Sequence, residues 1–274
     1  MGLGIRDDNE NMQDTTGKLR VSVLASGSKG NSIYISNGHT AILLDAGLSR
    51  TELIRRLSLR SISPDEIRAI LISHEHTDHI RGAGTFSRQF RIPVYMTPKT
   101  ALRAKQKKVL EKPYAFCPFT IGKSFSIDSL QIRSFSTSHD AEESSGFTIE
   151  QDGIKIGIAT DLGVATHMVR NHLKECHFLI LEANHDTDML HNGPYPWFLK
   201  QRIKGKLGHL SNIDARELLS GVCHKKLKHV VLAHVSEKNN CVHLLNDFFR
   251  PFFEKASVSF SIASQEEGTP VFSI

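Results

Sequence analysis

Five ionisable side chains crowd into one short segment, LISHEHTDHIRG, at residues 71–82. They are His74, Glu75, His76, Asp78 and His79. In an extended chain His74 and His76 point the same way, as chelation of one ion requires, and Asp78 and His79 then turn away to serve a neighbouring ion. Imidazole and carboxylate ligands suit zinc and also manganese or iron. The segment therefore predicts a metal site.

Three further candidate ligands follow apolar, strand-like runs. They are His139, Asp161 and His234. Residues at strand ends share one rim of a sheet, where rigid scaffolds commonly place sites. A single histidine is more often a hydrogen-bonded structural residue than a ligand, but four strand-end loops that all supply His or Asp favour a metal centre. A carboxylate such as Asp161 can bridge two ions, and two ions that share a hydroxide make a nucleophile at neutral pH.

The elements that must position these residues alternate between strands and helices. Strands are expected at residues 19–25, 32–36, 40–46, 68–73, 130–138, 146–151, 155–161, 177–183 and 229–235, and the runs SVSFSIA and VFSI close the chain in β structure. A helix is expected from Ser49 to about Leu59, and short helices interrupted by Gly82, Gly84 and Pro93 follow the ionisable cluster. The pattern predicts one α/β (α+β) domain over residues 19–274, with two mixed sheets packed together and helices outside.

Composition agrees with a globular cytoplasmic protein. The 274 residues are 39% hydrophobic, enough for a substantial core. The four cysteines lie far apart without a C-x-x-C pair, which favours reduced thiols in a cytosolic protein. Residues 1–18 are polar and predict a flexible tail rather than a signal sequence, and no segment approaches the length of a membrane-spanning helix.

The charge is unevenly distributed along the chain. The net charge is only +5, but nine Lys or Arg lie between Arg81 and Lys112 against the single acid Glu111. Such a run makes a polyanionic partner plausible. A helix within residues 98–112 that has a solvated basic face explains the run more simply, so charge alone does not decide between them.

The pattern H-x-H-x-D-H after a strand, with a lone His, a lone Asp and a C-terminal His behind it, resembles the metallo-β-lactamase superfamily over residues 19–274. The resemblance implies an αββα four-layer sandwich. It places His74, His76 and His139 on one metal, Asp78, His79 and His234 on the other, and Asp161 between them as a bridge. Glu75 occupies a variable position and is expected to be solvated. Asp45, in LLDAG, is expected to support the ligand loop. His76 argues against the iron oxidoreductases, which carry a carboxylate there.

Three downstream elements resemble the nuclease and phosphodiesterase branch that includes tRNA 3′-processing enzymes: LEANHD, GHLSNIDA and LAHVSEKNN. By this resemblance Glu182 orients His209, which protonates the leaving oxygen, and Asp78 completes the catalytic set. Ser211 takes a hydroxyl position, with Asn212 beside it as a second substrate contact. Alternatively, Ser211 or Asn212 simply caps a helix. Four basic residues stand just upstream, as phosphate contacts would require: Lys200, Arg202, Lys204 and Lys206.

A narrower resemblance rests on SGSKGNS, LLDAGLS, LEANHD with GPYPWFLKQRI behind it, and GHLSN. These elements are similar to the YycJ/WalJ-type bacterial family of cytoplasmic 5′-to-3′ DNA exonucleases linked to DNA repair. The preference for DNA and the polarity come from this resemblance only. In the SGSKGN loop, Ser28, Lys29 and Asn31 either contact phosphate or form a plain hairpin turn. His185 either meets substrate or caps a helix, and it is left out of the metal set.

The sequence thus predicts a phosphodiesterase with two divalent metal ions, zinc or else manganese or iron, that acts on nucleic acid, DNA rather than RNA, away from membranes. Two alternatives stay open. One is a hydrolase of a small cyclic phosphodiester, lactone or thioester, and the other is a catalytically silent scaffold for nucleic acid. Neither the metal nor the oligomeric state can be predicted from the chain.

Overall fold

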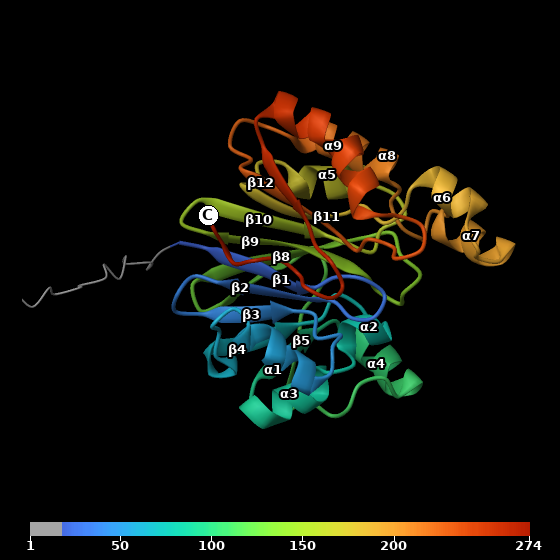
Figure 1. Cartoon of the computed structure of the whole chain (residues 1–274). Helices are drawn as coiled ribbons and strands as arrows, with labels where there is room; N and C mark the ends of the chain where they lie inside the picture. Colours follow the sequence, from blue (N-terminus) through green and yellow to red (C-terminus); the bar gives the residue numbers. More distant parts are fainter. Residues whose placement is uncertain (1–17) are drawn as a thin grey trace, which may run out of the picture.

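The computed structural model describes residues 18–274, which form two facing β-sheets with helices on both outer surfaces (Figure 1). Residues 1–17 of the expected tail lie outside the described residues. This arrangement confirms the predicted αββα sandwich. Within residues 18–274, no helix has the length and apolar character needed to cross a bilayer.

The first sheet has seven strands, six of them from the N-terminal half of the chain. In spatial order they are β14 (Phe272–Ser273), β1 (Arg20–Ala25), β2 (Ser32–Ser36), β3 (Ala41–Leu44), β4 (Ile67–Leu71), β5 (Pro93–Met96) and β6 (Ala115–Pro118). The pairs from β14 to β3 are antiparallel and those from β3 to β6 are parallel. The sheet is therefore mixed, as predicted.

The second sheet also has seven strands. In spatial order they are β13 (Ser259–Ile262), β12 (His229–Ala233), β11 (Phe178–Glu182), β10 (Ile154–Ala159), β9 (Ser145–Gln151), β8 (Leu130–Ser136) and β7 (Ser124–Ile127). Strands β10 to β13 are parallel, and β9 is antiparallel to both β8 and β10. Strands β8, β10 and β12 consequently run the same way, and their C-terminal ends meet at one rim of the sandwich.

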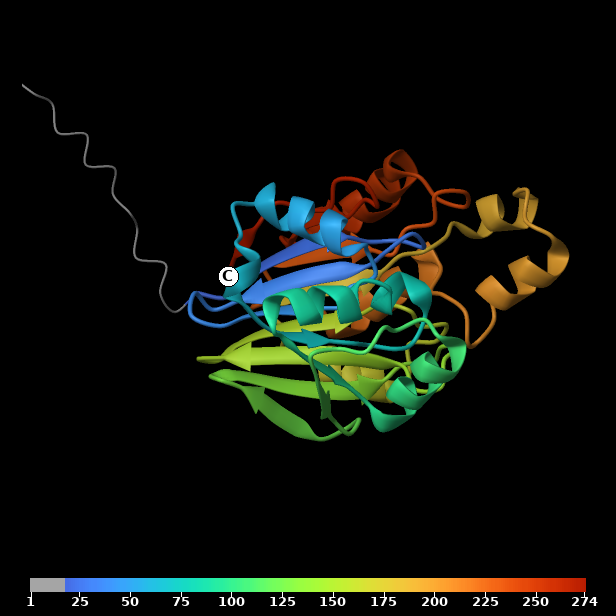
Figure 2. The same cartoon turned by 90° about the horizontal axis from the view of Figure 1, so that it is seen from below.

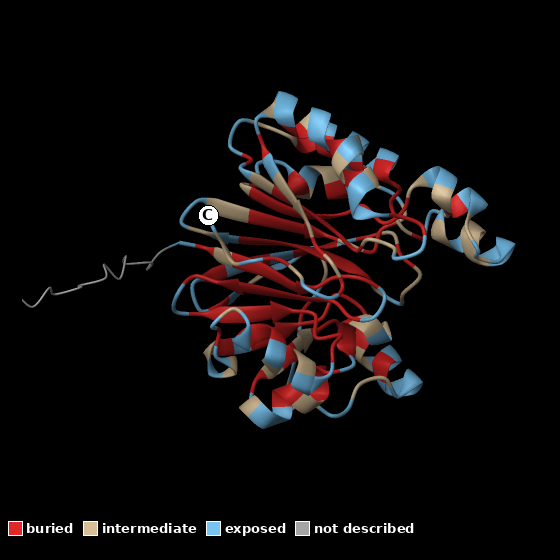
Figure 3. Ribbon diagram, viewed as in Figure 1, coloured by how far each residue is buried: buried red, intermediate tan, exposed pale blue. Residues whose placement is uncertain are grey.

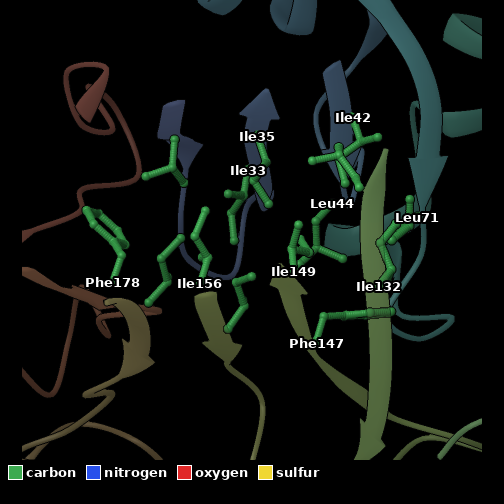
Figure 4. Close-up of a cluster of buried hydrophobic side chains, with 14 of the residues drawn as sticks. Ile33, Ile35, Ile42, Leu44, Leu71, Ile132, Phe147, Ile149, Ile156 and Phe178 are labelled. Atoms are coloured by element: carbon green, nitrogen blue, oxygen red, sulfur yellow. The ribbon is translucent and has the colours of Figure 1, made fainter. Parts of the chain in front are cut away.

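Both faces of the central strands are buried, which explains their nearly continuous apolar sequences. In β4, Ala69 and Leu71 face the core shared by the two sheets, whereas Ile70 faces the helices outside. In β11, Phe178 and Ile180 face that same shared core. Figure 4 shows side chains of both sheets meeting there. One core common to both sheets supports the interpretation of residues 19–274 as one domain, which stays a prediction.

The helices pack on the outer surfaces of the sheets. The first half of the chain contributes α1 (Arg50–Ser58), the 3-10 helix η1 (Pro64–Glu66), α2 (Thr77–Ile80), α3 (Ala83–Phe90) and α4 (Pro98–Lys107). The second half contributes α5 (His167–Leu173), α6 (Thr187–Asn192), α7 (Trp197–Ile203), α8 (Asn212–Val222) and α9 (Val242–Ala256). Most of these helices bury one side and expose the other, but α6 and α7 stand away from the body with much exposed surface (Figure 3).

The region after the ionisable cluster differs from the expectation in three ways. Pro93 begins strand β5 instead of interrupting helices, and the short strands β5, β6 and β7 were not predicted. Gly84 lies inside α3 and does not interrupt it. A Cβ at Gly84 would come within 2.1 Å of the Glu111 carbonyl oxygen, so glycine serves close packing there rather than helix termination.

Three loops interlock where the ionisable segment leaves β4. The Asn31 amide donates to the Asp78 carbonyl at 2.7 Å, and the Gly47 amide donates to the Asn31 carbonyl at 2.9 Å. A Cβ added at Gly47 would lie 1.6 Å from the Asp78 carbonyl oxygen. The loop after β3 can therefore approach the ionisable segment only if residue 47 has no side chain.

We expect Gly47→Ala to lower the free energy of unfolding by about 3 kcal/mol, because an added methyl group would force the interlocked backbones apart. Thermal or denaturant unfolding measures the loss. Gly122→Ala is the matched control: Gly122 has a φ of +85° but its Cβ would meet nothing within 4 Å, so it should cost only about 1 kcal/mol for the left-handed conformation. Equal losses in the two variants would contradict the interlocking of the loops.

Candidate metal centre and active site

The seven residues predicted to bind metal converge at the rim where β4, β8, β10 and β12 end. Their ligand atoms form clusters in which all atoms lie within 4.8 Å of one another. The clusters are His74 with His76 and His139; Asp78 with His79 and His234; His74 with His79 and Asp161; and Asp161 with Glu182, His209 and His234. The first two clusters are the two predicted triads.

In the first triad, His76 Nδ1 lies 3.0 Å from His74 Nε2 and 3.2 Å from His139 Nε2. In the second triad, Asp78 Oδ2 lies 3.4 Å from His79 Nε2 and 3.9 Å from His234 Nε2. Three nitrogens thus gather on one side, and two nitrogens with a carboxylate gather on the other.

Asp161 lies between the two triads. Its Oδ1 is 3.4 Å from His234 Nε2 and 3.7 Å from His139 Nε2, and its Oδ2 is 3.4 Å from His79 Nε2. This is the location that a bridging carboxylate needs. Asp161 and His234 have φ values of 56° and 53°, in the left-handed region that non-glycine residues seldom adopt. Such strain is typical of functional sites, where the surrounding structure enforces it.

The buried polar atoms of this cluster suit a divalent cation. Asp161 Oδ2 and His234 Nε2 are buried and have no hydrogen-bond partner among residues 18–274. A buried carboxylate oxygen without a partner is costly, and a cation offsets that cost. The donors are imidazole nitrogens and carboxylate oxygens, which zinc, manganese and iron accept. The residues therefore fit a bound metal.

The electrostatics of the cluster are dominated by burial and by opposite charges at short range. Burial holds the pKa of His74 well below its usual value. Burial alone would also lower the pKa of His79 and His234, but the Asp161 carboxylate and its neighbours outweigh it and raise both well above the usual value. A histidine must be neutral to bind a metal, so metal binding here competes with protons.

Asp45 supports the second triad from behind. Its Oδ1 accepts a hydrogen bond from the Ser73 amide at 2.8 Å. Its Oδ2 accepts from the Ser73 hydroxyl at 2.8 Å and lies 2.8 Å from His79 Nδ1. A carboxylate at Nδ1 fixes the tautomer of the imidazole and leaves Nε2 free as a ligand atom. Asp45 therefore has the structural position that the sequence predicts.

Glu182 ends β11 and contacts two histidines of the site. Its Oε1 lies 2.7 Å from His209 Nδ1 and 3.2 Å from His234 Nδ1, and its Oε2 accepts from the Leu162 amide at 2.9 Å. Burial alone would raise the pKa of Glu182, but the nearby His209 and His234 outweigh it and bring the pKa to about 2. The Glu182 carboxylate is thus ionised and orients the His209 ring, whose side chain is about one-fifth exposed.

Comparison with known proteins agrees with this geometry. Residues 40–235 match the family model described as a beta-lactamase superfamily domain. The chain is 35% identical over 228 residues to the exodeoxyribonuclease WalJ of Streptococcus pneumoniae serotype 2 (strain D39 / NCTC 7466), covering 82% of this chain and 85% of the relative. It is 34% identical over 228 residues to the exodeoxyribonuclease YycJ of Bacillus anthracis, covering 82% and 86%.

The chain belongs to the beta-lactamase superfamily. Within it, the chain belongs to the family of the WalJ and YycJ proteins. Among solved structures, the metallo-beta-lactamase fold protein YhfI from Bacillus subtilis superposes with a TM-score of 0.72 at 17% identity, covering 94% of this chain and 100% of that one. The fold and these relatives identify the protein as a metal-dependent hydrolase.

Two of the residues predicted to bind substrate, Ser28 and Lys29, lie at the surface of the protein. Ser28 lines a pocket together with His209 and His234. Lys29 is exposed and its Nζ lies 2.7 Å from the Glu237 carboxylate. Ser28 therefore borders the pocket of His209, whereas Lys29 is held by an ion pair and does not line that pocket.

Three other residues of the predicted substrate set are engaged within the protein. Asn31 is buried, and its side-chain amide donates to Asp78 Oδ2 at 3.2 Å. Ser211 caps α8 by accepting from the Asp214 amide at 3.1 Å, which is the capping alternative. Asn212 is only 1% exposed and accepts a hydrogen bond from Asn240 at 2.9 Å. These residues organise the loops around the site, because their polar atoms are already satisfied there.

The expectation of a solvated Glu75 is wrong. Glu75 is 1% exposed, and its Oε1 accepts from the Glu142 amide at 3.2 Å and lies 3.4 Å from Lys107 Nζ. The loop between His74 and His76 turns inward under α4, so a basic residue of that helix covers the carboxylate. His185 is also buried, and it takes part in none of the ligand clusters found in residues 18–274.

Asp140 was not predicted as a site residue, and Arg202 was expected only as one of the basic residues that contact phosphate. Asp140 Oδ1 is buried 3.4 Å from His139 Nε2, and it has no hydrogen-bond partner among the residues that the structure describes. Asp140 Oδ2 accepts from Arg202 Nε at 2.6 Å. The only signal for Asp140 in the sequence was its position directly after His139. Its partner Arg202 lies 62 residues away on α7, so the spacing in the sequence could not predict that the two residues pair.

We expect Asp45→Asn to weaken metal binding about 10- to 100-fold, because the neutral amide no longer fixes the His79 tautomer. Asparagine tolerates the left-handed backbone of residue 45, whose φ is 62°, so the fold should persist. Competition with a chromophoric chelator measures the affinity. Asp65→Asn, at an exposed carboxylate in η1, is the matched control. Unchanged affinity in Asp45→Asn would refute the supporting role.

Proposed function

We propose that this protein is a dinuclear metal-dependent phosphodiesterase that degrades DNA as a 5′-to-3′ exonuclease. The observation that carries the proposal is the contact between Glu182 and His209, 2.7 Å long, placed directly beside the two triads. The exodeoxyribonuclease names of the WalJ and YycJ relatives support nucleic acid as the substrate. The expected cytoplasmic location stays a prediction.

The two triads would hold the metals, one on His74, His76 and His139 and the other on Asp78, His79 and His234, with Asp161 shared. When bound, two divalent ions would polarise the phosphoryl group and supply a hydroxide nucleophile. Zinc, manganese and iron all suit these donors, so availability decides which is loaded.

His209 supplies the proton that the departing deoxyribose oxygen needs. Because Nδ1 of its ring faces the Glu182 carboxylate, Nε2 is the nitrogen left to donate to the leaving group. His209 lines the same pocket as Ser28 and Arg202, where a phosphate can be bound by polar and cationic groups.

We expect His209→Ala to lower kcat on DNA about 100- to 10,000-fold, since it removes the general acid, and to leave the metal content unchanged. Single-turnover cleavage of end-labelled DNA and elemental analysis measure the two quantities. His243→Ala is the matched control, because the His243 side chain is 90% exposed on α9. Wild-type activity in His209→Ala would refute the assignment of the acid.

Metal removal and substrate choice test the proposal as a whole. The purified protein should release nucleotides from the 5′ ends of DNA, lose this activity with a chelator, and regain it with zinc or manganese. Single- and double-stranded DNA and RNA are compared. Intact nucleic acids together with rapid cleavage of bis-p-nitrophenyl phosphate or a thioester would indicate a small-molecule hydrolase instead. DNA binding without turnover under every metal condition would indicate a scaffold.

A further inference from the structure

Helices α6 and α7 form an arm, residues 187–207, that projects from the sandwich in both views (Figures 1 and 2). The arm carries two large aromatic side chains in solvent. Trp197 is 65% exposed and Phe198 is 73% exposed, the highest value for any large hydrophobic side chain in residues 18–274. Two neighbouring exposed aromatic residues on a protruding helix indicate a binding surface. Single exposed apolar residues are common on protein surfaces, whereas contiguous exposed apolar patches mark interaction sites.

The surroundings of these rings are strongly basic. Residues 187–207 contain four cations, Lys200, Arg202, Lys204 and Lys206, against the single acid Asp188, and Arg202 is paired with Asp140 outside this segment. Lys204 Nζ lies 5.5 Å from the centre of the Trp197 ring. An apolar protein partner would not require this charge, whereas a polyanion with flat apolar groups matches both features.

The arm is also fastened to the active site. Leu199, Arg202 and Ile203 line the pocket that contains His209. The His209 amide donates to the Ile203 carbonyl at 2.8 Å, so α7 leads directly into the residue proposed as the general acid. Trp197 begins α7 and Lys204 directly follows its last residue. The two are seven residues apart, about two turns of helix, and lie on one side of α7, away from the pocket side of Leu199 and Ile203.

We propose that the arm binds an unpaired stretch of the DNA strand that is being degraded, with bases stacked on Trp197 and Phe198 and phosphates held by Lys204 and Lys206. An aromatic ring can stack only on a base whose face is free, which a duplex does not offer except at its end. The proposal rests on the proposed function. It adds that substrate strands enter along α7, and that the arm prefers single strands to blunt duplexes.

Trp197 is the only tryptophan of the chain, so intrinsic fluorescence reports on this ring alone. The full-length protein is titrated with oligo(dT) that carries hydrolysis-resistant phosphorothioate linkages. We expect saturable quenching that weakens as salt rises, and binding of a blunt duplex of equal length that is about 10-fold weaker. Quenching by duplex at equal affinity would overturn the preference for an unpaired strand.

Phe198→Ala keeps the fluorophore and should weaken binding of the oligonucleotide about 10-fold, the effect of losing one stacked base. Leu59→Ala is the matched control, because Leu59 is 66% exposed but lies at the end of α1. Thermal unfolding confirms that both variants are folded. Unchanged affinity in Phe198→Ala, or a fluorescence change that follows protein concentration instead of oligonucleotide, would overturn the proposal, and the second result would assign the surface to another copy of the chain.

The binding measurement requires no turnover, so it separates the two proposals. Quenching without DNA cleavage would support the arm and refute the exonuclease. Cleavage of DNA without any change in Trp197 fluorescence would refute the arm and leave the exonuclease standing.

Discussion

Buried negative charge at the rim of the sandwich is the constraint on which the rest of this structure depends. Asp45, Asp161 and Glu182 are almost fully enclosed, and a carboxylate without compensation is too costly to bury. Each is compensated by imidazole groups and, for Asp45 and Glu182, by backbone amides as well. The histidines are therefore part of the charge balance of the fold as well as candidate ligands. Loss of a carboxylate removes one of the contacts that orient these histidines.

The two sheets bring this cluster together because the parallel strands end at the same rim. His139, Asp161 and His234 follow β8, β10 and β12 of the second sheet, while the ionisable segment follows β4 of the first. The shared core of aliphatic side chains fixes the distance between the sheets, so ligands from both can meet. Left-handed backbone at Asp45, Asp161 and His234 then turns each side chain inward, at a cost that the close packing of the neighbouring loops offsets.

The sequence predicted those parts of the protein that depend on local pattern. Buried strands such as β11 are continuous apolar runs and were predictable for that reason. The ligands within the H-x-H-x-D-H loop were predictable because their spacing sets the direction of each side chain. Glu75 was not, because its burial depends on where α4 places Lys107. The strands β5 to β7 were missed because they are short and partly exposed, whereas β3, which has the same length, is buried throughout. Asn31 and Asn212 look like exposed loop residues in sequence, but they are satisfied by partners 47 and 28 residues away.

Glu182 links metal binding to acid catalysis more closely than the sequence indicated. One of its oxygens faces both His209 and His234, and the other accepts from the amides of Leu162 and Leu210. Four contacts from three separate segments converge on one carboxylate, and two of them are backbone amides, so its position does not depend on either histidine alone. A change at Glu182 would disturb a candidate metal ligand and the proposed acid together. A change at His209 leaves the contact between Glu182 and His234 in place. A mutation of His209 can therefore test the acid role without disturbing metal binding, whereas a mutation of Glu182 cannot.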